Sequence, residues 1–351
     1  MKATKRHSLG MGVLIALFTL SLFGLNGAAA AGKVYRLKIQ SAWPHGDISM
    51  GLLKEFASAV EKKSNGRVKI KVFAAPDIVP TENLFNACKR GTVDMMQGGG
   101  VVWGNIIPVA NVEFGLPGTF MVPEEKTFEG KAEAIRKFFF KSGLVDILRE
   151  EYAKQGLYFL DIHVYGPVPI TLSTKEIKKC SDLKGMIVRA DGLDMIYQAA
   201  VGMKPVSVPG EEAYVALKTG VVDAAEWDIS CITGLKWYEV APYWLRGMEN
   251  DDDLGSIEVN MKKWNSLPDD IKAIIADAAK DYFYATVRGY KEAMDEANQL
   301  VKEGKLFSIE LDQECRDKYA ARAKKIMDEE AVKDPATAKA IKLVKKWRGI
   351  Q

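Results

Sequence analysis

The chain has 351 residues and carries 49 Lys and Arg against 46 Asp and Glu. Three of the basic residues, Lys2, Lys5 and Arg6, belong to an N-terminal targeting segment, so the 46 basic residues that remain equal the 46 acidic ones. This balance gives no electrostatic support for binding to nucleic acid or to an anionic membrane surface. The remaining ~320 residues are enough for two domains.

The N-terminal segment has the pattern of a secretory signal peptide. Residues 8–32 contain no charged residue, and alanines occupy positions 28–31. A basic start, an apolar stretch and a small-residue end are typical of such signals, so we assign residues 1–31 to a cleaved signal and expect the mature protein in the periplasm. An uncleaved membrane anchor is the alternative, and the small residues argue against it. Because no cysteine precedes Cys88, a lipid-modified N-terminal cysteine is excluded.

Strand and helix patterns alternate in the first half of the chain after the signal. Apolar residues alternate along residues 36–42, recur at helical spacing along residues 50–64 and alternate again along residues 67–73, which predicts strand, helix and strand. The octapeptide pattern Ala-x-Lys-x-Gly-x-Val-Asp follows at residues 87–94. It indicates a helix that ends in a left-handed glycine cap and a strand that begins just after it.

The same octapeptide pattern occurs again at residues 216–223, and its flanks repeat as well. The predicted strand, helix, strand and helix before and within this copy occupy residues 186–190, 194–200, 204–208 and 211–218. Both halves therefore have the order βαβαβ, which predicts an α/β protein with two similar lobes, each a parallel sheet with helices on its faces. In such sheets ligands bind outside the carboxyl ends of the strands.

Helical patterns dominate the C-terminal part of the chain. Residues 266–270 form a helix start, with a serine cap and acidic residues in the first turn, and apolar residues keep helical spacing through residues 271–301. We expect this long helix to cross both lobes and pack on each; an exposed stripe used for dimerisation is the alternative. A helix at residues 312–328 and an amphipathic basic tail at residues 339–348 follow.

Four cysteines would reach a compartment where disulfides form. They are Cys88, Cys180, Cys231 and Cys315, and their spacing matches no metal-binding pattern. The sequence does not choose among the pairings. Cys88 lies in an apolar helical segment and is predicted to be a buried thiol, while a disulfide between Cys180 and Cys231 is a hypothesis.

The chain carries little of the chemistry that an enzyme needs. After the signal only His45 and His163 remain, and neither lies in a metal or nucleophile motif. The glycines at positions 98–100 are not followed by the Lys-Ser/Thr pair of a phosphate-binding loop, so we attribute them to a close approach of the backbone to a cleft. These observations predict a binding protein and not an enzyme.

Arg189 is the strongest candidate for a ligand contact. It follows the apolar run Met-Ile-Val at residues 186–188, which places a permanent, fork-shaped cation at the end of a strand. Such a group binds a carboxylate, a sulfonate or a phosphate through paired charge-assisted hydrogen bonds. An ion pair with Asp191 or Asp182 is the alternative, and the position at a strand end favours the ligand.

Acidic residues follow the end of another predicted strand. If Glu226 and Asp228 share the cleft with Arg189, they oppose an anionic ligand, because like charges ~4 Å apart repel by about 4 kcal/mol at an effective dielectric of ~20. Either one acid points away, or the ligand carries an ammonium, or a cation such as Na⁺ or Ca²⁺ lies between them. Flat apolar walls and polar groups would shape the rest of the cleft. The residues predicted to do so are Trp43, Gln97, Trp103, Tyr165 and Trp227.

Four motifs occur in an order that a known family shares. They are Asn-Gly-Arg-Val-Lys-Ile at 65–70, Asp-Leu-Lys-Gly-Met-Ile-Val-Arg at 182–189, Ala-Leu-Lys-Thr-Gly-Val-Val-Asp-Ala-Ala-Glu at 216–226 and Trp-Asn-Ser-Leu-Pro at 264–268. Over nearly the whole mature chain they resemble the substrate-binding proteins of TRAP transporters, the tripartite ATP-independent periplasmic systems for organic acids. The resemblance implies a two-lobed, type II-like periplasmic binding protein that delivers its ligand to a membrane permease. We place lobe I at residues 32–162 plus about 236–265, and lobe II with the C-terminal helices at residues 163–235 plus about 266–351.

The resemblance also implies roles for single residues. Arg189 matches the family's carboxylate-binding arginine. Glu226 followed by Trp227 is similar to a branch that binds 2-oxo and 2-hydroxy monocarboxylates with a cation, held by the glutamate and the tryptophan carbonyl. The wider family has a second arginine near Val168, where this chain has Tyr-Gly-Pro-Val-Pro, which argues against a dicarboxylate. Asn250 is the candidate for a further metal ligand.

The leading hypothesis is a periplasmic protein that captures a 2-oxo or 2-hydroxy monocarboxylate with an apolar or aromatic side chain, or a sulfonate of similar size. It would deliver this anion to TRAP membrane subunits, and it would need no cofactor beyond a bridging Na⁺ or Ca²⁺. The alternatives are a ligand-sensing subunit that docks on a membrane receptor and an exported enzyme. The sequence is compatible with a monomer and with a homodimer.

Overall fold

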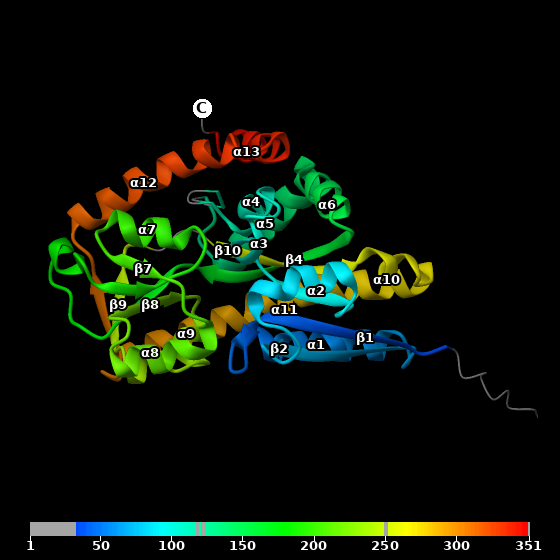
Figure 1. Ribbon diagram of the computed structural model, residues 1–351, viewed down its shortest axis with the longest axis horizontal. Coiled ribbons are helices and arrows are strands. Elements are labelled where there is room, and N and C mark those ends of the chain that lie inside the picture. Colours follow the sequence, from blue (N-terminus) through cyan, green and yellow to red (C-terminus); the bar gives the residue numbers. More distant parts are fainter. Residues whose placement is uncertain (1–32, 117–118, 121, 123, 249–251, 350–351) are drawn as a thin grey trace, which may run out of the picture. The chain divides into compact units, whose positions relative to one another are not determined.

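The protein, seen in a computed structural model, is described for residues 33–116, 119–120, 122, 124–248 and 252–349 (Figure 1). The predicted signal peptide and the candidate metal ligand Asn250 lie outside these residues. From Val34 onward the described residues belong to one compact unit that contains two mixed β-sheets with flanking helices. None of their helices is both long and apolar enough to cross a lipid bilayer.

The first sheet contains the first βαβαβ unit. Its strands, in spatial order, are β2 (Val68–Ala75), β1 (Tyr35–Pro44), β3 (Met95–Gly98), β10 (Asp252–Asn260) and β4 (Leu157–Pro167). β1 pairs in parallel with β2 and β3, whereas β10 pairs antiparallel with β3 and β4. The connecting helices are α1 (Ile48–Lys63), η1 (Thr81–Asn83) and α2 (Leu84–Arg90). α1 buries Leu53, Phe56 and Val60, the stripe that its helical spacing predicts.

The second sheet repeats this plan. Its strands, in spatial order, are β11 (Phe307–Glu310), β9 (Tyr243–Arg246), β5 (Ile170–Ser173), β8 (Ala224–Trp227), β6 (Ile187–Arg189) and β7 (Lys204–Val206). β6 pairs in parallel with β7 and β8, and β5 pairs antiparallel with β8. The helices of this unit are η2 (Cys180–Leu183), α7 (Asp194–Ala200), η3 (Gly210–Glu212), α8 (Ala213–Thr219), α9 (Ser230–Thr233) and η4 (Trp237–Glu239).

The orders β2-β1-β3 and β7-β6-β8 are equivalent, which confirms the two βαβαβ units. The expectation of purely parallel sheets is wrong, because each unit adds an antiparallel strand next to its third strand: β10 beside β3, and β5 beside β8. The chain crosses from the first sheet to the second between β4 and β5, and returns between β9 and β10. β10 therefore joins the first sheet only after the chain has passed through the second lobe, and β5 is the first strand that the chain forms in the second lobe.

The repeated octapeptide builds the same local structure twice. Gly91 ends α2 with φ +82°, and Gly220 ends α8 with φ +75°, a left-handed conformation that glycine adopts without strain. The aspartate that closes each copy bonds to the first strand of its own βαβαβ unit. Asp94 accepts from the Lys38 backbone N–H at 2.8 Å, and Asp223 accepts from the Ile187 backbone N–H at 2.9 Å. The repeat is thus a helix-to-strand connection that is anchored to the adjacent strand.

The remaining helices cover both sheets. They are α3 (Gly100–Trp103), α4 (Val109–Phe114), α5 (Phe128–Ser142), α6 (Leu144–Lys154), α10 (Met261–Asn265), α11 (Asp269–Lys302), α12 (Gln313–Ala331) and α13 (Pro335–Arg348). α11 packs on α1 and β4 of the first lobe and on α9 of the second, so the predicted long helix crosses both lobes. α12 packs on α7 and α13 on α4 and α6 (Figure 1). The C-terminal helices therefore contact both lobes and do not belong to lobe II alone.

The sheets also move the lobe boundaries that we predicted. β9 lies within the segment 236–265 that we assigned to lobe I, yet it pairs with β5 and β11 of the second sheet. β4 continues beyond residue 162 to Pro167 and pairs with β10 of the first sheet. Sequence periodicity could not locate either point, because strand pairing at long range decides it.

All four cysteines are buried and free. Burial confirms the prediction for Cys88. The Cys180–Cys231 hypothesis is wrong in this structure: the sulfur of Cys180 lies close to that of Cys315, while Cys231 lies in α9 near the acidic groups of the candidate site.

Candidate ligand-binding site

A cavity of about 560 Å³ lies where strand ends and connecting loops of the two lobes face each other. Its walls include Trp43 from β1 and Tyr165 from β4 of the first lobe, and Arg189, Glu226 and Trp227 from β6 and β8 of the second. The volume lies within the range of about 300–1,000 Å³ that small-molecule sites occupy. The position agrees with the expectation that ligands bind beyond the carboxyl ends of parallel strands.

Arg189 projects from the end of β6 and is only 2% exposed. Its Nε donates to the Val208 carbonyl at 2.9 Å, and its Nη1 donates to the carbonyl and the Oε1 of Glu226 at 3.1 and 3.0 Å. Nη2 donates to the Asp191 carboxylate. The guanidinium carbon lies 4.6 Å from the ring centre of Trp227, a cation–π distance. These contacts hold the cation in one orientation at the cavity wall.

Acidic groups outnumber basic ones around this cavity. Among the described residues that line it, Arg189 is the one cationic side chain, and the carboxylates are Glu82, Asp191, Asp194, Glu211, Glu212, Glu226 and Asp228. Burial, and then the neighbouring Asp194, raises the pKa of Glu226 well above its ordinary value, although Arg189 opposes the shift. Burial likewise raises the pKa of Asp194 to about 7. Arg189 alone therefore does not offset the cost of ionising these buried carboxyls.

Three aromatic side chains form the apolar part of the wall. The ring centres of Trp43 and Trp227 lie 5.3 Å apart at an edge-to-face angle of 74°, and those of Trp43 and Tyr165 lie 5.7 Å apart. The indole Nε1 of Trp43 donates to the Tyr165 hydroxyl at 2.5 Å. These rings form an apolar wall beside the buried arginine, a combination that suits an organic anion with an apolar side chain.

Gln97 supports this wall from behind and does not line the cavity. It is fully buried, accepts from the Ser41 hydroxyl at 2.6 Å and donates from Nε2 to the Tyr165 hydroxyl at 3.0 Å. Its Nε2 also lies 2.9 Å from Nε2 of His163. Gln97 therefore fixes the orientation of Tyr165, which in turn fixes Trp43.

Trp103 lies away from the cavity, contrary to its predicted role as a wall. It is fully buried in the core of the first lobe, where its Nε1 donates to the Tyr152 hydroxyl at 2.6 Å. The cause is the glycine triplet. A Cβ on Gly98 would lie 2.9 Å from the Trp103 ring, and a Cβ on Gly100 would lie 1.7 Å from the Ala110 carbonyl. These glycines permit close packing of α3 and α4, and not an approach to the ligand.

Asp47 does not line the cavity but bonds to one of its wall residues, a role that sequence reasoning missed. It caps α1, accepting from the Ser49 backbone N–H at 2.8 Å, and its other oxygen accepts from Nε1 of Trp227 at 3.0 Å. It thus links the first lobe to a wall residue of the second. An aspartate just before an amphipathic helix is a recognisable cap signal, but no sequence pattern reveals its partner across the lobes.

The lobes touch at further points around the cavity. The Ile48 backbone N–H donates to the Ser230 hydroxyl at 3.3 Å, and a Cβ on Gly192 would lie 2.5 Å from a Val101 methyl group. Asp228 faces this interface: it accepts from the Ser230 backbone N–H and from the Tyr290 hydroxyl of α11. Burial, and then Asp47, raises its pKa well above the ordinary value. The walls of the cavity are therefore connected directly to each other.

A buried arginine and aromatic walls in a cavity between two βαβαβ lobes define a two-lobed solute-binding protein. Residues 39–334 match the family model DctP, the bacterial extracellular solute-binding protein family 7. The chain belongs to this family, the periplasmic substrate-binding proteins of TRAP transporters, which bind small organic acids. Because these proteins are not enzymes, the prediction of a binding protein is confirmed.

Named relatives and solved structures are similar to the chain over most of its length. A monocarboxylate 2-oxoacid-binding periplasmic protein from Nostoc is 25% identical over 86% of this chain and 80% of its own. A TRAP solute-binding protein of Pseudoalteromonas atlantica with bound sodium and pyruvate has a TM-score of 0.80 at 23% identity, covering 90% of this chain and 94% of its own. One from Bordetella bronchiseptica, with copurified calcium and picolinate, has a TM-score of 0.78 at 23% identity, covering 90% and 92%. These structures share the fold.

Proposed function

We propose that this protein captures a 2-oxo or 2-hydroxy monocarboxylate with an apolar or aromatic side chain for uptake through a TRAP-type transporter. The observation that carries the proposal is the buried Arg189 at the end of β6, beside the rings of Trp43 and Trp227. The arginine supplies a forked donor for one carboxylate. Because Arg189 is the one cationic side chain among the described lining residues, a second carboxylate on the ligand would face acidic groups.

The cavity volume supports a ligand larger than the smallest oxo acids. About 560 Å³ leaves space beyond a carboxylate and its neighbouring oxygen, and the rings of Trp43, Tyr165 and Trp227 border it. Apolar walls of this kind favour an aliphatic or aromatic side chain. The relative from Nostoc is named for monocarboxylate 2-oxoacids, which supports a 2-oxo carboxylate as the head group of the ligand.

We infer that a cation takes part in binding. Glu226 and Asp194 are buried carboxyls at the cavity wall, so their oxygen donors fit a cation such as Na⁺ or Ca²⁺. Such an ion would offset the repulsion between these acids and the ligand carboxylate. Two solved relatives contain sodium or calcium together with an organic acid. The predicted ligand role of the Trp227 carbonyl and of Asn250 stays a prediction.

Isothermal titration calorimetry with the mature protein tests the proposal. The panel contains pyruvate, a branched 2-oxo acid, phenylpyruvate, lactate, succinate and an arylsulfonate, each with Ca²⁺, with Na⁺ and with a chelator. We expect the larger monocarboxylates to bind most tightly and Arg189→Ala to weaken them by about 100-fold, the loss expected for a buried charge-assisted contact. Arg67→Ala is the matched control, because Arg67 is a half-exposed partner of Asp270 and does not line the cavity. Unchanged binding in Arg189→Ala, or preference for succinate, would contradict the proposal.

A further inference from the structure

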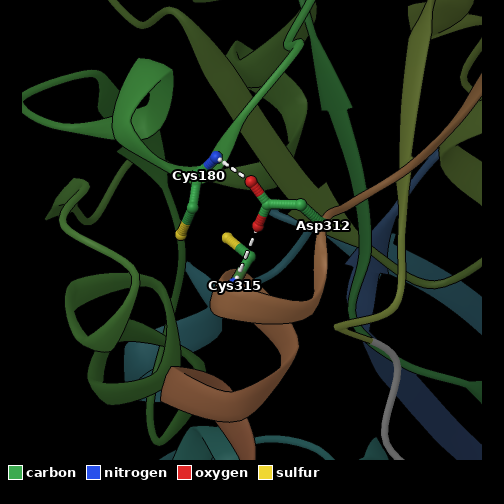
Figure 2. A group of neighbouring side chains, drawn as sticks. All are labelled: Cys180, Asp312 and Cys315. Atoms are coloured by element: carbon green, nitrogen blue, oxygen red, sulfur yellow. Dashed lines mark hydrogen bonds between the residues drawn. The ribbon is translucent and has the colours of Figure 1, made fainter.

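We propose that Cys180 and Cys315 form a disulfide in the exported protein. Their sulfur atoms and the nearest Asp312 oxygen all lie within 4.8 Å of one another, and both cysteines are buried at 1% and 0% exposure. Figure 2 shows the two sulfur atoms directed into the same space beside the Asp312 carboxylate. The inference is independent of the ligand proposed above, because neither cysteine lines the cavity.

Asp312 holds the two cysteines next to each other. Its Oδ2 accepts from the Cys180 backbone N–H and its Oδ1 accepts from the Cys315 backbone N–H, both at 2.9 Å (Figure 2). The second of these bonds is the N-cap of α12. One carboxylate therefore joins the start of η2 to the first turn of α12. A disulfide of about 2.05 Å requires the two sulfur atoms to approach each other more closely than 4.8 Å.

A metal site explains this cluster less well. A structural zinc site takes four protein ligands, and the described residues supply three groups here. Both oxygens of Asp312 already accept backbone hydrogen bonds. An exported chain with two adjacent thiols is the situation in which disulfides form.

The bond would form during folding, before the thiols are covered. Burial raises the pKa of the Cys315 thiol, so the reactive thiolate is scarce once the fold is complete. The thiolate of one cysteine attacks the disulfide bond of an exported oxidant and forms a mixed disulfide. The second cysteine then attacks this mixed disulfide and displaces the oxidant. Two S–H bonds and the oxidant's S–S bond are lost, one S–S bond forms in the protein, and the oxidant leaves as a dithiol with both protons.

Mass spectrometry of mature protein purified from the periplasm without reductant tests this directly. The unfolded, unreduced protein is treated with an alkylating reagent and then digested. We expect alkylation of Cys88 and Cys231 only, together with a Cys180–Cys315 cross-linked peptide that disappears on reduction. Alkylation of all four thiols, a different pairing, or a stoichiometric metal released on alkylation of Cys180 and Cys315 would overturn the proposal.

Thermal unfolding of serine variants provides a second test. Reductant should lower the Tm of the wild type, Cys88→Ser and Cys231→Ser, and leave that of the Cys180→Ser/Cys315→Ser double variant unchanged. Each single variant, Cys180→Ser or Cys315→Ser, should lose about as much Tm as the double variant, because either change removes the whole bond. Additive losses would contradict a shared bond. If a variant fails to fold, the peptide map of the wild type still decides.

Discussion

Arg189 and Glu226 form a pair whose charge can be tested residue by residue. Nη1 of Arg189 lies 3.0 Å from Oε1 of Glu226, and both side chains are almost completely buried. A ligand carboxylate that reaches Arg189 therefore also comes close to Glu226 and Asp194. Whether Glu226 helps or hinders binding depends on whether a cation lies between the two carboxylates, since a cation reverses the sign of that interaction.

Glu226→Gln distinguishes these cases. With a bridging cation, we expect the variant to weaken binding of the preferred carboxylate by about tenfold or more and to remove its dependence on Na⁺ or Ca²⁺. Without a cation, the loss of a repulsive charge would strengthen binding. Calorimetry with and without chelator measures both effects. Glu82→Gln is the control, because Glu82 also lines the cavity but is exposed.

His163 should make the protein sensitive to acid. Burial lowers its pKa to about 3, below the value near 6.5 of an unfolded chain. Since the unfolded state then binds more protons, this contribution to stability is complete above about pH 6.5 and is lost as the pH falls toward 3. Between pH 7 and pH 4 the free energy of unfolding of the wild type should fall. In His163→Gln this fall should be smaller by about 3 kcal/mol. Denaturant titrations at both pH values measure it; His45→Gln, with an exposed ring, should retain the full loss.

At the scale of elements, the repeated octapeptide gains a physical explanation. Its glycine ends a helix and its aspartate bonds to the first strand of the same βαβαβ unit, in α2–β3 and again in α8–β8. Asp94 is 7% exposed and also pairs with Lys263, whereas Asp223 is more exposed and pairs with Lys175. The two copies therefore perform the same task at different depths.

Asp94→Ala should destabilise the protein more than Asp223→Ala. Each change leaves a strand N–H without its side-chain acceptor, and the deeper group has less access to water. We expect a loss of about 1–3 kcal/mol for Asp94→Ala and about 1 kcal/mol or less for Asp223→Ala in urea unfolding. Asp295→Ala, which removes an exposed pair within α11, should change stability by less than about 0.5 kcal/mol. Equal losses in all three variants would refute the anchoring role.

Periodicity predicted the elements that carry their own amphipathic pattern and missed those defined by long-range pairing. The strands at 36–42, 67–73 and 186–190 and the helix at 271–301 correspond to β1, β2, β6 and α11. β10 has acidic and glycine residues along its length and becomes a strand by pairing with β3 and β4. No local pattern marks such a segment.

The same limit applies to the site. Arg189, Glu226 and Trp227 stand at ends of predicted strands, and the structure brings them to the cavity with Trp43 and Tyr165. Trp103 also follows the end of a predicted strand, but its ring packs in the core, in the space that the missing side chain of Gly98 leaves. Asp194 and Asp47 were missed because their partners, Glu226 and Trp227, come from other elements.

At the scale of the whole molecule, the contacts between the lobes allow the closure of the lobes to be tested. Two-lobed binding proteins close around ligands by hinge motion, and interactions between the lobes bias that equilibrium. The bond from Trp227 Nε1 to Asp47 Oδ2 joins a wall residue of one lobe to the cap of α1 in the other. Because Trp227 also packs against Trp43 in the cavity wall, this bond connects the contact between the lobes with the wall that faces the ligand.

Asp47→Asn should loosen this connection while it keeps the helix cap. An asparagine oxygen still accepts from the Ser49 backbone N–H, but its amide then turns a donor toward the Trp227 N–H. If the closed population falls about tenfold, the apparent affinity for ligand falls by the same factor. Calorimetry gives the affinity, and small-angle X-ray scattering compares the radius of gyration with and without saturating ligand. Asp334→Asn, at the cap of α13, should change neither. An unchanged affinity in Asp47→Asn would mean that the bond between Asp47 and Trp227 does not contribute to closure.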